Sequence, residues 1–199
     1  MNKIINNTIR KKLNKRGKRK NAQHVAKSLI LTGFNPDGAK SKITSIRKLI
    51  RESKATIVTI QETKCSLYGQ LKCYGFYTYE HLRTNREGGG VALAVLKELN
   101  PTFVCDGGEE VEAITVYIHL KDMAVSVIYA YGPLENAGAL KKKAFWDHLS
   151  EQAQYANASG KGLILQGDLN SWLGTLYLPG DKKKTHKTVM VKCFRIFWN

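Results

Sequence analysis

The sequence predicts a mixed α/β sandwich for residues 28–181, the central part of a chain of 199 residues. Segments with the length and apolar pattern of strands alternate there with segments of helical spacing, which is typical of sheets covered by helices. Two neighbouring strand-like segments are joined by a tight connection, as in a β-hairpin, and a hairpin excludes a purely parallel sheet. We find no internal repeat in the sequence.

The first half of the central part contains two predicted strands with a predicted helix between them. A short apolar run at 29–31 ends in a turn at 33–38, where Pro and Gly interrupt regular structure. Apolar residues then recur at helical spacing over 43–50, with Lys and Arg between them. The β-branched run at 55–60 has the length of a buried strand and stops abruptly at the polar residues 61–64.

The second half contains four more predicted strands and a second helix. Three consecutive glycines lead into an apolar strand at 91–95. Residues 114–120 and 125–131 each alternate with period two, so they predict the two strands of the hairpin. Apolar residues over 145–153 mark one face of an amphipathic helix, and a last strand follows at 162–166.

Polar residues follow at once where four of these strands end. In chain order they are Asn35 and Asp37, Gln61 and Glu62, Tyr131, and Asp168 and Asn170. Singly, each has a simpler explanation as a turn residue, a solvated loop or a cap. If the strand ends converge, they form a site rich in carboxylates and amides. Such hard oxygen ligands suit Mg²⁺ or Mn²⁺ rather than zinc.

The net charge of +16 comes from the two ends of the chain. Residues 1–27 hold ten Lys or Arg and residues 182–199 hold six, both without an acid, so residues 28–181 are neutral overall. The N-terminal segment is too polar and too charged to fold alone, and we expect a disordered tail. Its cations predict phosphate contacts, a nuclear address or merely a solvated tail, with a mitochondrial presequence as a lesser alternative. The cations proposed to bind nucleic acid are Lys11, Lys12, Arg16, Lys18, Arg19 and Lys20.

The composition argues against several classes of protein. The hydrophobic content of 43% is that of a globular protein. No apolar run approaches the ~18–20 residues needed to span a bilayer. The polar, basic start lacks the apolar region of a secretory signal, and the four Cys lack metal-ligand spacing. We therefore expect an intracellular, nuclear protein with reduced thiols.

Four ordered motifs resemble those of the endonuclease/exonuclease/phosphatase superfamily, over about residues 28–181. They are Asn35-Pro36-Asp37-Gly38, Ile60-Gln61-Glu62-Thr63-Lys64, Tyr129-Ala130-Tyr131-Gly132-Pro133 and Gln166-Gly167-Asp168-Leu169-Asn170. The second motif is similar to the exonuclease III and apurinic endonuclease branch. Residues 86–91 and 167–174 resemble the endonuclease domains of non-LTR retrotransposons, which are associated with a reverse transcriptase.

The resemblance implies a two-sheet, four-layer α/β sandwich of the DNase I-like type that hydrolyses phosphodiester bonds of DNA. It implies Mg²⁺ or Mn²⁺ as the cofactor, with no small-molecule cofactor and no membrane partner. Glu62 would be the principal metal ligand, and Asp37 would lie close to the ion, directly or through water. Gln61 would support them.

The resemblance also implies roles for four other residues. Asp168 would orient or deprotonate the attacking water, and Asn170 would hydrogen-bond that water and the scissile phosphate. Tyr131 would donate to a phosphate oxygen, and Asn35 would position its neighbours. Hydrolysis would take one step, without a covalent enzyme intermediate.

One part of the family pattern is missing. Family members continue through another strand and close with a Ser-Asp-His motif, whereas no such motif follows Asn170 and His186 has no Asp before it. We therefore expect a domain that is incomplete at its C-terminus, with residues 182–199 as a basic tail and the start of a truncated helix. Without the His, DNA nicking should be at least ~10³-fold slower than in an intact member.

Two alternatives to an active endonuclease stay open. One is a non-catalytic relic that binds nucleic acid through its basic ends. The other is a phosphatase or phosphodiesterase of the same fold, because a fold by itself does not fix a substrate. The sequence contains no feature that predicts an oligomeric state.

Overall fold

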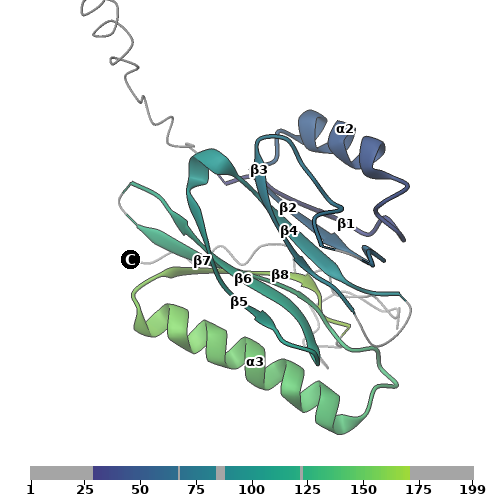
Figure 1. The fold of residues 1–199 in the computed structure, drawn as a ribbon. Helices are drawn as coiled ribbons and strands as arrows, with labels where there is room; N and C mark the ends of the chain where they lie inside the picture. Colours follow the sequence, from purple (N-terminus) through teal and green to yellow (C-terminus); the bar gives the residue numbers. More distant parts are fainter. Residues whose placement is uncertain (1–28, 67, 84–87, 122, 171–199) are drawn as a thin grey trace, which may run out of the picture.

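The computed structural model describes residues 29–66, 68–83, 88–121 and 123–170, which form two four-stranded sheets packed face to face. One helix lies on the outer face of each sheet, so the described part has four layers (Figure 1). The predicted two-sheet, four-layer α/β sandwich is confirmed. The predicted tails at 1–27 and 182–199 lie outside the described residues.

The first sheet has the order β1-β2-β4-β3. Its strands are β1 (Leu31–Phe34), β2 (Ile57–Gln61), β3 (Phe76–His81) and β4 (Val91–Leu96), and a short 3-10 turn η1 (Lys97–Leu99) follows β4. β1 pairs with β2 in parallel, and β4 pairs antiparallel with β2 and β3. Residues Ile57–Ile60 and Val91–Val95 are buried, which explains why β2 and β4 are apolar without interruption.

Helix α2 (Ile43–Ser53) covers the outer face of the first sheet. Ile46 and Ile50 are its buried residues, one helical turn apart, and they pack against a cluster that includes Val58 and Ile60 of β2. The helix ends at Lys54, whose left-handed conformation lets its N–H bond back to the carbonyl of Arg51.

The second sheet has the order β5-β6-β7-β8. Its strands are β5 (Pro101–Gly107), β6 (Val111–His119), β7 (Ala124–Tyr131) and β8 (Gly162–Asp168). β6 and β7 form the predicted hairpin, and β8 pairs with β7 in parallel after the crossover through α3 (Ala139–Ala158). Helix α3 covers the outer face of this sheet with Phe145 and Leu149.

The core between the sheets follows from the period-two alternation of the hairpin. Ile114 and Val116 on β6 and Val127 and Tyr129 on β7 are fully buried against Leu93 and its neighbours on β4. The intervening residues of the hairpin face α3 instead. A shift of one residue in the strand register would exchange these two faces, so the pattern fixes the register.

Two strands were not predicted, and both lie at sheet edges. β3 carries aromatic and β-branched residues that favour a strand, but its edge position leaves it only partly buried and without a clear apolar pattern. β5 begins at Pro101 and contains register shifts, as edge strands do. No helix in the described ranges combines the length and apolar character needed to cross a bilayer.

Candidate active site

In each sheet, parallel pairing brings the C-terminal ends of two strands side by side at one edge. β1 and β2 run parallel with Phe34 beside Ile60, and β7 and β8 run parallel with Tyr131 beside Asp168. In each pair, the polar residues that follow the strands therefore leave the sheet at the same edge. Whether these two edges lie together depends on contacts between the two sheets, and Glu62 makes such a contact.

Glu62 is held by three contacts from other segments. Its backbone oxygen accepts from the N–H of Gly38 at 2.9 Å, and its Oε2 accepts from the N–H of Gly89 at 3.0 Å. Its carboxylate also hydrogen-bonds with the hydroxyl of Tyr131, which belongs to the opposite sheet. The predicted metal ligand is therefore fixed in place, and its contact with Tyr131 joins the two edges.

Three of the predicted site residues have a left-handed backbone. The φ angles are 48° for Asp37, 51° for Glu62 and 45° for Asn170. Residues other than glycine rarely adopt this conformation, which costs ~1–3 kcal/mol each where the surroundings impose it. Such residues concentrate at functional sites, so the strain agrees with the prediction that these strand ends form one.

Tyr131 lies at the centre of the cluster. Burial raises its pKa to about 12, and the hydrogen bond to Glu62 and the negative charge of Glu62 add to the shift. The hydrogen bond between Asn170 and this hydroxyl lowers the pKa of Tyr131, and the negative charge of Asp168 raises it. Tyr131 therefore keeps its proton at neutral pH and donates it in the hydrogen bond to Glu62.

Asp168 and Asn170 form a compact turn after β8. Asp168 Oδ1 accepts from the backbone N–H of Asn170 at 3.1 Å, and Asn170 Nδ2 donates to the carbonyl of Gly132 at 2.8 Å. Gly132 in turn donates its N–H to the carbonyl of Asp168 at 2.7 Å. A Cβ on Gly132 would come within 2.1 Å of a neighbouring backbone oxygen, so only glycine allows this close approach.

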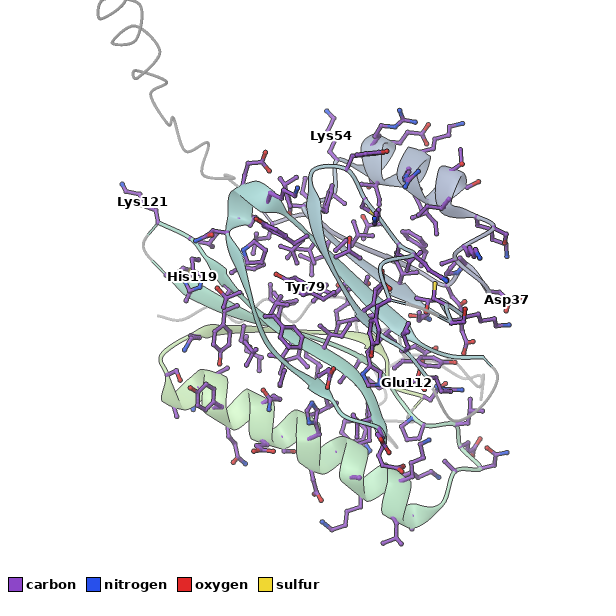
Figure 2. The ribbon with its side chains drawn as sticks, viewed as in Figure 1. Asp37, Lys54, Tyr79, Glu112, His119 and Lys121 are labelled. Atoms are coloured by element: carbon purple, nitrogen blue, oxygen red, sulfur yellow. The ribbon has the colours of Figure 1, made fainter. Side chains whose placement is uncertain are left out.

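Asn35 and Asp37 lie in the exposed turn after β1. Asn35 Oδ1 accepts from the N–H of Asp37 at 2.9 Å. The ammonium of Lys64 hydrogen-bonds with the Asp37 carboxylate, and this bond lowers the pKa of Asp37. Figure 2 shows Asp37 at one end of the sandwich and His119 and Lys121 at the other.

Gln61 precedes Glu62 in the chain, and its side chain connects the two sheets. Its Oε1 accepts from the hydroxyl of Tyr129 at 3.4 Å. Tyr129 is fully buried, and burial raises its pKa well above the usual value, with a further contribution from the charge of Asp168. The hydroxyl therefore stays protonated and needs an acceptor inside the core, which Gln61 supplies.

The donor set fits a small hard cation that keeps several waters. The described residues contain no group of three or more His, Cys, Asp or Glu arranged to hold a metal by themselves. Mg²⁺ does not need such a group, because it is usually bound by one or two carboxylates and completes its octahedron with water and substrate oxygens. Glu62 supplies one such carboxylate, and the turn that carries Asp37 is bonded to the backbone oxygen of Glu62 through the N–H of Gly38.

The phenol of Tyr131 should titrate near pH 12 rather than at its usual value of 10.0. The absorbance of phenolate in the wild type minus that in Tyr131→Phe measures this group alone. Because the folded state holds the proton more tightly, the stability it contributes is complete below about pH 10 and is lost as the pH rises to about 12. A difference titration centred on pH 10 would show that the hydroxyl is neither buried nor bonded to Glu62.

The structure thus brings together Glu62, Tyr131, Asp168 and Asn170, with Gln61 behind them. Asn35 and Asp37 occupy the adjoining turn. Their chemical roles stay predictions. The basic residues 11–20 lie outside the described residues.

Four residues of the site region were not predicted from the sequence. Lys64 was part of the Gln-Glu-Thr-Lys motif and could have been chosen from it. Gly89 was noted as leading into a strand and as part of the motif at residues 86–91, but not as a residue of the site. Arg83 and Glu112 belong to no motif, and only their contacts with the glycines reveal them.

A family model described as "Endonuclease/Exonuclease/phosphatase family" matches residues 21–188 of the chain. No curated protein sequence matches it. Among solved structures, the chain is similar to TDP2 from Caenorhabditis elegans, with a TM-score of 0.56 and 12% identity over 71% of this chain and 47% of that one.

Two AP endonucleases are also similar in structure. The enzyme from Leishmania major has a TM-score of 0.51 and 15% identity, over 70% of this chain and 54% of that one. The enzyme from Archaeoglobus fulgidus has a TM-score of 0.51 and 19% identity, over 72% of this chain and 58% of that one. The chain therefore spans about half the length of these structures, and the likeness establishes the DNase I-like fold.

Proposed function

Because the chain belongs to the endonuclease/exonuclease/phosphatase family, we propose that it hydrolyses phosphodiester bonds of DNA with the help of Mg²⁺ or Mn²⁺. The observation that carries this proposal is the contact of Tyr131 with both Glu62 and Asn170 at one end of the sandwich. This contact supports the proposal because the carboxylate that would hold the metal lies beside hydrogen-bonding groups that suit a phosphate. DNA is favoured as the substrate by the Gln-Glu-Thr-Lys motif and by the likeness to AP endonucleases.

The residues of the site have complementary roles in this proposal. Glu62, with Asp37 nearby, would hold the cation, which withdraws negative charge from the phosphoryl group. Asp168 orients the attacking water and accepts its proton as the water oxygen bonds to phosphorus and the bond to the leaving oxygen breaks, and the leaving oxygen takes up a proton from solvent water. Asn170 and the protonated Tyr131 would turn their hydrogen bonds from each other and from Glu62 to the phosphate oxygens, where negative charge develops.

The biological setting is part of the same proposal. The likeness of residues 86–91 and 167–174 to non-LTR retrotransposon endonucleases supports nicking of a target DNA. The cations at 11–20 support phosphate contacts and a nuclear location.

Purified protein should convert supercoiled plasmid to the nicked form with Mg²⁺ and stop doing so when EDTA is added. An oligonucleotide with one abasic site, an intact oligonucleotide and a phosphomonoester serve as parallel substrates. Preference for the abasic duplex would favour repair-type cleavage, and equal nicking of intact DNA would favour target-site cleavage. Hydrolysis of the monoester alone would overturn the proposal in favour of a phosphatase.

The alternative of a non-catalytic binder is tested by the same preparation. A non-catalytic binder would bind labelled duplex but form no Mg²⁺-dependent product, even when the protein is in excess over the DNA. The rate of the nicking reaction, compared with an intact family member, measures the predicted loss of at least ~10³-fold.

A further inference from the structure

Three consecutive glycines, Gly88–Gly90, form the loop that supports the Glu62 carboxylate. All three have a left-handed backbone, with φ angles of 79°, 69° and 80°. The N–H of Gly89 donates to Glu62 Oε2 at 3.0 Å. The carbonyls of Gly89 and Gly90 accept from the N–H groups of Lys64 and Thr63 at 3.0 and 3.1 Å. The loop is therefore bonded both to the Glu62 carboxylate and to the backbone of the two residues that follow Glu62.

A second acid holds this loop from the opposite sheet. The Oε2 of Glu112 accepts from the N–H of Gly90 at 2.7 Å. Glu112 is the cross-strand partner of Tyr131, so it lies on the face of β6 that looks toward the first sheet. Figure 2 shows Glu112 between the two sheets, toward the end that carries Asp37. Adjacent glycines of one loop thus bond to two different acids, one of them the predicted metal ligand.

Arg83 completes the arrangement. Its Nε donates to Glu112 Oε1 at 2.7 Å, and its second guanidinium nitrogen donates to the same oxygen. A Cβ on Gly89 would come within 2.2 Å of the guanidinium carbon, so the guanidinium packs directly on the glycine. The side chains of Arg83 and Glu112 are only 22% and 11% exposed, and a charge-assisted bond is strong in such surroundings.

We propose that Arg83 and Glu112 are positioning residues that lock the Gly88–Gly90 loop and, through the N–H of Gly89, fix the Glu62 carboxylate for metal binding. This inference rests on the proposed function, because it assumes that Glu62 holds the cation. Neither residue reaches the Glu62 side chain in the contacts described above. They keep the N–H of Gly89 directed at one of the two carboxylate oxygens of Glu62. Residues that orient a metal ligand in this way typically contribute 10–100-fold to metal affinity.

The test is the dissociation constant of Mn²⁺, measured by electron paramagnetic resonance on the full chain. Glu112→Ala should weaken Mn²⁺ binding by ~10–100-fold. Glu112→Gln keeps the shape and an oxygen that accepts from Gly90 but turns its amide N–H groups toward the Arg83 guanidinium, so it should restore only part of the affinity. Arg83→Lys keeps the charge but loses the planar two-nitrogen contact, so it should also weaken binding, and it serves if Glu112→Ala does not fold.

Glu80→Ala is the matched control. The Glu80 carboxylate also accepts two backbone N–H groups of a loop, those of Gly69 and Leu71, at 3.0 and 3.1 Å. It contacts neither the glycine loop nor Glu62 in those bonds, so its removal should lower the melting temperature and leave the Mn²⁺ dissociation constant unchanged. If Glu112 had only a structural role, Glu112→Ala would give the same result as Glu80→Ala, with a lower melting temperature and an unchanged Mn²⁺ dissociation constant.

Glu62→Ala separates the two proposals. Suppose that Glu62→Ala abolishes Mn²⁺ binding. Wild-type Mn²⁺ affinity in Glu112→Ala would then overturn the positioning role, and Arg83→Lys gives the same test if Glu112→Ala does not fold. Unchanged Mn²⁺ binding in Glu62→Ala would instead overturn the metal role of Glu62, and the positioning role would fall with it. Equal weakening by Glu80→Ala and Glu112→Ala would also contradict the inference, because it would show a general effect of loosened loops.

Discussion

Replacing Glu62 with alanine should reduce Mg²⁺-dependent nicking of DNA by at least ~10³-fold, because it removes the carboxylate proposed to hold the cation. This corresponds to a loss of ~4 kcal/mol of transition-state stabilisation. Nicking of supercoiled plasmid over a series of Mg²⁺ concentrations measures it. Higher Mg²⁺ should not restore the rate, since no other carboxylate is proposed to take the place of Glu62.

Alanine at this position also removes the partners of Gly89 and Tyr131, so a second variant is needed. Glu62→Gln keeps an oxygen that can accept from the N–H of Gly89 and from the hydroxyl of Tyr131, while it loses the negative charge. It should lose nicking almost as strongly as Glu62→Ala but melt near the wild-type temperature. Nicking at the wild-type rate in Glu62→Gln would show that Glu62 is not a metal ligand.

Glu52→Gln is the control for a general loss of negative charge. Glu52 lies on α2 in an exposed pair with Lys48, with 3.8 Å between the charged atoms. Exposed pairs of this kind contribute ~0–1 kcal/mol to stability. Both nicking and melting temperature should therefore stay close to those of the wild type.

Replacing Phe145 with alanine should lower the free energy of unfolding by ~3–5 kcal/mol, the range for removing a buried aromatic ring. Phe145 is 1% exposed and packs in the cluster between α3 and the outer face of the second sheet. This loss is a large share of the ~5–15 kcal/mol that stabilises a typical domain. Urea unfolding followed by circular dichroism measures it.

Trp146 is the matched control, because it is the next residue on α3 and also aromatic. It is 39% exposed and meets the ring of Phe145 edge-on at 5.3 Å between ring centroids. Trp146→Ala should therefore cost only ~1 kcal/mol. Equal losses for the two variants would mean that α3 is not anchored through Phe145.

The sequence predicted the part of the fold that depends on local patterns. The alternation along β6 and β7 identified the hairpin and its buried face, and the unbroken apolar runs identified β2 and β4 as interior strands. The edge strands β3 and β5 were missed because partial burial weakens the apolar pattern from which a strand is inferred.

The sequence also identified most of the candidate site. Asp37, Glu62 and Asn170 could be chosen because each follows directly on a strand and carries an oxygen ligand or an amide. That the strand ends meet was an expectation, and the parallel pairings of β1 with β2 and of β7 with β8 explain it. The sequence did not reveal that these three residues share a left-handed backbone.

By itself, the sequence determined the kind of fold and which residues are candidates for the chemistry, because strand patterns and motifs are properties of neighbouring residues. Only the tertiary structure decided what holds those residues in place. Glu112 is 29 residues from Arg83 and 22 from Gly90, yet it bonds to both. Such contacts depend on how two sheets pack and on which side chains then lie opposite each other, and no local pattern encodes that distance.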